Sequence, residues 1–145
     1  MAVGSLLILC QGNICRSPMA EALFANALPG SKVSSAGLGA LVGYPADPLA
    51  IQLMSSRDLN INNHIARQVS FHMVRESDIV LTMSLRQKEH TLSLFSFARG
   101  RVFSIGERED FEVIDPYRQG LPVFELSLSQ IDRGVKTWLP ILSKI

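Results

Sequence analysis

The sequence predicts an α/β fold, a single three-layer domain whose central four-stranded parallel sheet is flanked by helices. Short apolar runs alternate along the chain with segments of helical periodicity, the pattern of βα units. The clearest apolar run, Leu6–Leu9, has no polar position, which is typical of a strand buried on both faces. The length of 145 residues, 47% of them hydrophobic, suits one compact domain covering residues 1–145.

Four segments are candidate strands. Leu6–Leu9 is the most apolar of them, and it is followed along the chain by Lys32–Ala36. Asp78–Thr82 is the third candidate and contains a second apolar run typical of a buried strand, and Arg101–Phe103 is a short fourth candidate. Because helical segments separate these strands, we expect parallel pairing through right-handed crossovers.

The predicted helices are marked by capping residues and by periodicity. Ser17 followed by proline predicts an N-cap, with a helix that stops near Pro29. Further helices are expected from Asp47 to about Arg57, over Ser70–Glu76 and from Ser84 to about Leu94. Apolar residues spaced by three and four predict a last amphipathic helix, which Pro140 should end or kink; they are Phe124, Leu128, Ile131, Val135 and Trp138.

Composition excludes several classes of protein. Lys and Arg number 14 against 13 Asp and Glu, and this net charge of +1 argues against a dedicated nucleic-acid binder. Two cysteines are too few for a disulfide scaffold or a four-cysteine zinc site. Neither a basic leader nor an apolar stretch of about 20 residues is present, so we expect a cytoplasmic location without stable membrane insertion.

The segment from Cys10 to Pro18 predicts an anion-binding loop between the first strand and the first helix. A loop at a helix N-terminus can aim successive backbone N–H groups at one anion. Gly12 permits close approach of the backbone, and Asn13 tolerates a left-handed conformation. Arg16 adds a planar guanidinium that suits two phosphate oxygens.

The same loop would stabilise Cys10 as a thiolate, the form in which a cysteine is nucleophilic. An isolated cysteine at a strand end is more often a small buried apolar residue. The arginine six positions later, with Gly-Asn between, favours the nucleophile. A nucleotide-binding P-loop is excluded because no Gly-Lys-Ser/Thr follows the strand.

The segment Cys10-Gln-Gly-Asn-Ile-Cys-Arg-Ser-Pro18 closely resembles the signature of the low-molecular-weight protein tyrosine phosphatases. Three further segments match in order: Ser35-Ala-Gly37, His64-Ile-Ala-Arg-Gln68 and Asp115-Pro-Tyr117. The stretch Ser35–Gly43 is most similar to the bacterial branch associated with capsule and exopolysaccharide export.

The resemblance implies a phosphocysteine mechanism that uses neither cofactor nor metal. Cys10 would attack phosphorus while Arg16 and the loop amides hold the other oxygens. Asp115 would protonate the departing phenolic oxygen and later act as the base that activates water. On spacing alone, Asp115-Pro-Tyr would be read as a turn, and it is the resemblance that makes Asp115 the acid.

The resemblance also assigns residues around the reacting group. Tyr117 would stack on a phosphotyrosine ring, and Leu41 stands where many relatives have a second aromatic residue. The residues expected to contact substrate are Gln11, Gly12, Asn13, Ile14, Cys15, Ser17, Leu41 and Tyr117, with Ser35 and His64 supporting the loop. The expected partners are a phosphotyrosine protein, in particular a bacterial tyrosine autokinase, and inorganic phosphate or another oxyanion in the loop.

Other interpretations stay open on the sequence. An arsenate reductase uses the same fold and cradle but needs further cysteines outside the loop, which this chain lacks. A non-catalytic phosphate-binding module is disfavoured because both the nucleophile and the acid are present. Cys15 either packs beneath the loop or forms a reversible disulfide with Cys10 under oxidation. Arg118, where animal members have a second tyrosine, offers a cation to acidic substrates.

Overall fold

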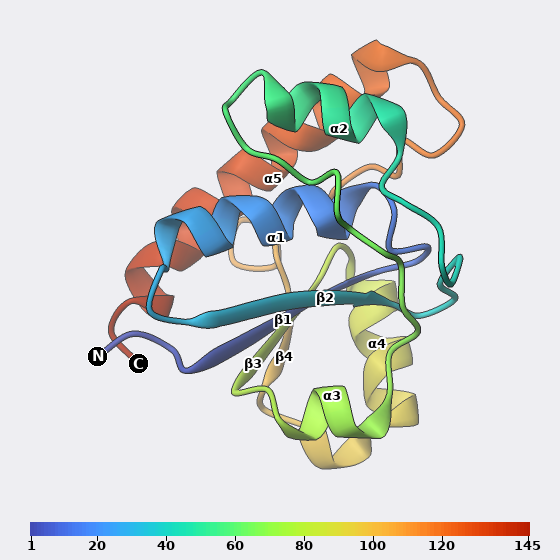
Figure 1. Ribbon diagram of the computed structural model, residues 1–145. Helices are drawn as coiled ribbons and strands as arrows, with labels where there is room; N and C mark the ends of the chain where they lie inside the picture. Colours follow the sequence, from blue (N-terminus) through green and yellow to red (C-terminus); the bar gives the residue numbers. More distant parts are fainter.

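A four-stranded, all-parallel sheet forms the centre of the computed structural model, which describes residues 1–145 (Figure 1). Its strands are β1 (Ser5–Cys10), β2 (Lys32–Gly37), β3 (Ile79–Thr82) and β4 (Val102–Ser104). The strand order is β2-β1-β3-β4, so β1 is central and pairs with both β2 and β3. The predicted four-stranded parallel sheet is confirmed.

Helices cover both faces of this sheet. Helices α1, α2 and α5 lie on one side of it in Figure 1, while α3 and α4 lie on the other. The helices are α1 (Arg16–Ala27), α2 (Pro48–Ser55), α3 (Phe71–Arg75), α4 (Leu85–Leu94) and α5 (Leu121–Leu142), with a 3₁₀ turn, η1, at Ser96–Ala98. The three layers expected from the sequence are therefore present.

The alternation of side chains along β1 divides the core in two. Leu6, Ile8 and Cys10 face the larger cluster, which includes the apolar sides of α1 and α5. Leu7 and Leu9 face the smaller cluster, with residues of β3, α3 and η1. Because both faces are covered, the part of β1 after Ser5 has no position where a polar side chain could reach water, which explains its uninterrupted apolar sequence.

The start of α1 differs from the sequence prediction. The helix begins at Arg16 and its N-cap is Cys15, which makes no side-chain capping bond. Ser17 is not the N-cap, because its hydroxyl is used within the site described below. The predicted helix starts at Asp47 and Ser84 are confirmed: each residue is an N-cap, Asp47 accepting a hydrogen bond from Leu49 N and Ser84 accepting one from Gln87 N.

Helix α5 does not end at Pro140, which was one of the two outcomes expected there. Helix α5 continues through Pro140 to Leu142. Proline lacks an N–H and therefore removes one hydrogen bond to the preceding turn. Since Pro140 lies in the last turn, few helical bonds follow it, and the buried side chains of Trp138 and Leu142 hold that turn against the core.

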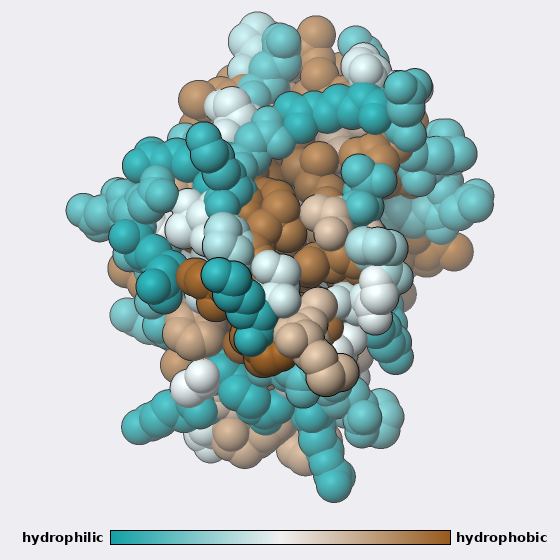
Figure 2. Space-filling view, turned by 90° about the vertical axis from the view of Figure 1, so that its left-hand side faces the viewer, coloured by the Kyte–Doolittle hydropathy of each residue, from teal (hydrophilic) through white to brown (hydrophobic).

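Both termini lie at the same end of the molecule, away from the loop that joins β1 to α1 (Figure 1). Val3 N donates to Leu142 O over 2.7 Å and ties the two ends of the chain together. Figure 2 shows this side, with hydrophobic residues in a central hollow and hydrophilic side chains around it. None of the helices combines the length and the apolar character that crossing a membrane requires.

Candidate active site

A pocket of about 200 Å³ opens at the carboxyl end of β1, where the chain turns into α1. The carboxyl edge of a parallel sheet is the usual ligand site of α/β proteins, because loops from several strands meet there. Its lining comes from three stretches of the chain that the fold brings together. The lining residues are Cys10, Gln11, Gly12, Ile14, Cys15, Arg16, Gly39, Leu41, Asp115 and Tyr117.

The loop from Cys10 to Ile14 has all five of its backbone carbonyls bound to donors outside the loop. Three donors come from the segment after β2, one is a histidine ring and one is the N-cap of α2. In chain order the pairs are Leu38 N to Cys10 O, Gly39 N to Gln11 O, Leu41 N to Gly12 O, His64 Nε2 to Asn13 O and Asp47 N to Ile14 O, at 2.6–3.1 Å.

This arrangement fixes where the loop's N–H groups point. No peptide bond is cis, and in a trans peptide the N–H points opposite to the preceding carbonyl. The N–H groups of residues 11–15 therefore face away from the five donors, toward the pocket. Asn13 N donates to Cys10 Sγ over 3.3 Å, and the other four N–H groups have no acceptor within the protein. Converging free N–H groups form an anion-binding nest.

Asn13 anchors the loop from behind. It has φ of 59°, in the left-handed region that asparagine tolerates, and it is fully buried. Its Nδ2 donates to Ser17 Oγ at 2.7 Å and to Ser35 Oγ at 3.0 Å. Its Oδ1 accepts from Arg67 N at 3.0 Å. These bonds hold the turn in one conformation.

Ser17 links this anchor to the sulfur. Cys10 is 2% exposed, and its Sγ lies 2.9 Å from Ser17 Oγ. Since Ser17 Oγ already accepts from the Asn13 amide, the hydroxyl hydrogen is available to donate to the sulfur. The Cys10 sulfur thus lies within hydrogen-bond distance of a hydroxyl and a backbone N–H.

Glu21 is part of the same network, although sequence reasoning missed it. Ser35 Oγ donates to Glu21 Oε1 over 2.5 Å, so an acidic residue of α1 fixes the direction in which Ser35 donates. In the sequence, Glu21 is an ordinary polar residue of a predicted helix. No sequence signal distinguishes it, because its role depends on β2 lying beside α1.

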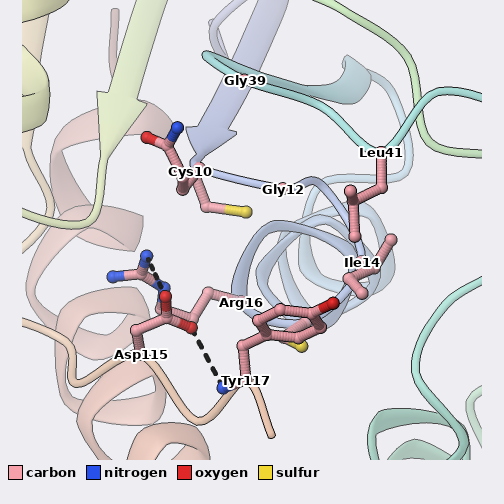
Figure 3. A pocket seen from close by; sticks show the side chains of 10 residues that line it. Cys10, Gly12, Ile14, Arg16, Gly39, Leu41, Asp115 and Tyr117 are labelled. Atoms are coloured by element: carbon pink, nitrogen blue, oxygen red, sulfur yellow. Dashed lines mark hydrogen bonds and ion pairs between the residues drawn. The ribbon is translucent and has the colours of Figure 1, made fainter.

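Arg16 and Asp115 lie next to each other, on the side of the pocket opposite Cys10 (Figure 3). The Arg16 side chain is 7% exposed, donates through Nη1 to Val113 O at 3.0 Å and places Nη2 3.5 Å from Asp115 Oδ2. The Asp115 carboxyl is 49% exposed, and its Oδ1 accepts from Tyr117 N at 3.1 Å. The Asp-Pro-Tyr turn thus presents a carboxyl toward the loop and an aromatic ring beside it.

Apolar side chains form the walls of the pocket. Tyr117 stands on one side, and Leu41 and Ile14 stand together on another (Figure 3). The guanidinium of Arg118 lies 5.1 Å from the centre of the Tyr117 ring. Tyr44 is 57% exposed and lies outside the lining, so Leu41 forms the second wall without it.

Cys15 lines the same pocket as Cys10. Burial, reinforced by the negative charges of Asp47, Cys10 and Asp115, holds the pKa of the Cys15 thiol well above its usual range. Cys15 therefore stays protonated at neutral pH. Both cysteines are free thiols in the structure.

The structure brings the residues predicted from the sequence together in two layers. Nine of the ten lining residues belong to the predicted set. The side chains of Asn13, Ser17, Ser35 and His64 lie behind the loop and do not line the pocket. The tenth lining residue, Gly39, was not predicted from the sequence. A Cβ at this position would lie 2.6 Å from Gln11 Nε2, so glycine leaves room for the Gln11 side chain.

The fold and the site together define a small α/β phosphatase with a cysteine at its phosphate loop, and comparison with known proteins agrees. The family described as low molecular weight phosphotyrosine protein phosphatase matches residues 5–145. The probable low molecular weight protein-tyrosine-phosphatase EpsP of Ralstonia nicotianae is 46% identical over 138 residues, which cover 95% of each chain.

Two solved structures have the same fold. Wzb of Vibrio vulnificus, in complex with benzylphosphonate, superposes with a TM-score of 0.92 at 31% identity, covering 97% of this chain and 99% of that one. The YwlE arginine phosphatase of Geobacillus stearothermophilus gives a TM-score of 0.89 at 26% identity, covering 96% and 92%.

The chain belongs to the low molecular weight phosphotyrosine protein phosphatase family. The predicted family, fold and enzyme class are confirmed, and protein-tyrosine phosphatase activity is favoured over an arsenate reductase or a non-catalytic module.

Proposed function

We propose that the pocket hydrolyses phosphotyrosine through a phosphocysteine on Cys10. The supporting observation is the outward bonding of five consecutive loop carbonyls, which directs the N–H groups of residues 11–15 into the pocket. Those groups and the Arg16 guanidinium match the equatorial oxygens of a phosphoryl group in transfer. They supply positive potential from the protein itself.

The reaction divides into two displacements. In the first, the Cys10 thiolate forms an S–P bond as the P–O bond to the phenol breaks, and Asp115 gives its proton to the departing oxygen. In the second, water forms a new P–O bond as the S–P bond breaks, and Asp115 takes the proton from that water. The thiolate is regenerated and inorganic phosphate leaves.

The walls of the pocket favour an aromatic phosphate ester. Leu41, Ile14 and Tyr117 can contact both sides of a phenyl ring, which phosphoserine lacks. Asp115 is the only carboxylate in the lining, and it lies within 3.5 Å of Arg16. No further carboxylate is available there to pair with the guanidinium of a phosphoarginine, so the site suits phosphotyrosine better.

The physiological substrate we propose is an autophosphorylated bacterial tyrosine kinase of exopolysaccharide production. The likeness of Ser35–Gly43 to that branch and the relatives named EpsP and Wzb support this choice. Arg118 at the pocket rim would favour an acidic substrate segment. A purified enzyme that left such a kinase phosphorylated while cleaving other phosphotyrosine proteins would contradict it.

The proposed activity is tested by comparing three peptides of one sequence that carry phosphotyrosine, phosphoserine or phosphoarginine. We expect rapid release of phosphate from the first alone, unchanged by a chelator and blocked by vanadate. Cys10→Ser should abolish it, because a serine hydroxyl ionises far less readily than a thiol. Faster release from the phosphoarginine peptide would contradict the assigned substrate class.

A further inference from the structure

The carboxamide of Gln68 bridges two backbone groups of the segment that follows β2. Its Nε2 donates to Leu38 O at 2.8 Å and its Oε1 accepts from Ala40 N at 2.9 Å. Neither backbone group has another partner in the protein. The side chain thus occupies the place where a neighbouring strand would pair.

The bridged segment has a second contact, with the phosphate loop. Leu38 N, Gly39 N and Leu41 N donate to the loop carbonyls, whereas Ala40 N points to Gln68. These bonds on two sides, to the loop and to Gln68, determine the orientation of the segment. Leu41 then stands over the pocket, where its side chain forms a wall together with Ile14.

The backbone of Gln68 is itself held next to β2. Gly37 N donates to Arg67 O, and Val69 N donates to Gly37 O, both at 2.9 Å. A Cβ on Gly37 would lie 2.7 Å from Gln11 O, so the close approach of this segment to the loop depends on glycine. The backbone at Gln68 is therefore held in place, and this determines which groups its side-chain amide can reach.

We propose that Gln68 is a specificity-positioning residue that holds Leu41 against the aromatic ring of the substrate. It does not line the pocket itself and acts through Leu41. The phosphate loop has the other donors described above, including His64 and Asp47, which do not depend on Gln68. Loss of the bridge should therefore affect ring binding more than anion binding. The proposal rests on the phosphatase function proposed above.

The test separates the two kinds of binding. In Gln68→Glu, which loses one of the two bonds, we expect KM for an aryl phosphate to rise about threefold, the effect of roughly one hydrogen bond. In Gln68→Ala, which loses both bonds, KM should rise at least as much. The carboxylate of Gln68→Glu keeps the acceptor for Ala40 N but cannot donate to Leu38 O. The inhibition constant of vanadate, which has no ring, should change less than twofold. Gln52→Glu, on the exposed face of α2, is the matched control.

A double-mutant cycle tests whether Gln68 acts through Leu41, a residue of the pocket wall. Leu41→Ala should raise KM for the aryl phosphate without changing the inhibition by vanadate. Adding Gln68→Ala to Leu41→Ala should have no further effect, because coupled residues are not additive. Additive effects, a KM unchanged in Gln68→Ala, or a proportional loss of vanadate inhibition would overturn the assignment.

Amide hydrogen exchange provides a readout that needs no turnover. Exchange at Ala40 N–H should accelerate in Gln68→Ala but much less in Gln68→Glu, which keeps the acceptor. Equal exchange in all three proteins would contradict the bridge. A wild-type protein with a protected Ala40 amide and no aryl phosphatase activity would instead contradict the proposed function.

Discussion

Asp115 is the residue whose role depends most on its neighbours. It is half exposed, lies 3.5 Å from the Arg16 guanidinium and accepts from Tyr117 N. Its position at the pocket mouth suits proton transfer to an oxygen leaving opposite Cys10. The sequence alone presented Asp-Pro-Tyr as a turn, and the turn is real; the fold adds that the turn meets the phosphate loop, 105 positions after Cys10.

We expect Asp115→Asn to slow hydrolysis most for esters with poor leaving groups. A phenol of high pKa needs a proton as it departs, whereas a strongly acidic phenol leaves as its anion. The slope of log kcat against leaving-group pKa should become steeper in the variant. Equal losses across a series of substituted phenyl phosphates would remove Asp115 from the acid role.

The two cysteines should differ in reactivity at neutral pH. Burial and nearby negative charge hold the pKa of Cys15 well above its usual range, so its thiol remains protonated. Alkylation with iodoacetamide at pH 7, followed by peptide mass spectrometry, should label Cys10 and leave Cys15 largely unmodified. Prior incubation with vanadate should protect Cys10. Preferential labelling of Cys15 would contradict this account.

At the scale of elements, the loop between β1 and α1 depends on three separate segments for its shape. The stretch after β2, the N-cap of α2 and His64 each bind loop carbonyls. The sequence predicted the loop because its own residues carry a recognisable pattern. No role was predicted for Glu21, Gly39 or Gln68, although Gln68 ends one of the segments that match the family. What each of these side chains does becomes visible only when packing shows what it touches.

Helix α5 packs closely against the end of β4 through Gly134. A Cβ at this position would lie 2.5 Å from Ile105 Cγ1, inside the buried core. We expect Gly134→Ala to lower the free energy of unfolding by about 1–3 kcal/mol, the usual cost of overpacking. Urea denaturation measures this change. An alanine variant as stable as the wild type would show that the contact can relax.

At the scale of the whole molecule, the chain divides into parts that the sequence predicts well and parts that it does not. Strand β1 and the amphipathic α5 were predicted because burial determines their patterns. The exact start of α1 was not predicted, because serine is a common N-cap residue but the hydroxyl of Ser17 contacts the sulfur of Cys10 instead. Helix α5 continues past Pro140 because tertiary packing outweighs one lost hydrogen bond.

Acid should weaken the attachment of the turn after β4 to α5. Hydrogen bonds from Thr137 and Arg133 lower the pKa of Glu109. A carboxyl with a lowered pKa stabilises the fold above its unfolded pKa of about 4.3, and this contribution disappears as pH falls through the folded value. Glu109→Gln should therefore reduce Tm at pH 7 and have little effect near pH ~3. A Tm difference that does not depend on pH would contradict the assignment.

The central claim is that Cys10, held in a nest of N–H groups with Arg16, takes the phosphoryl group from its substrate. Rapid acid quench of the enzyme during turnover of a phosphotyrosine peptide tests this claim most directly. We predict phosphate bound covalently to the peptide that contains Cys10, and none in Cys10→Ser. Phosphate recovered on another residue, or efficient turnover by Cys10→Ser, would contradict the account.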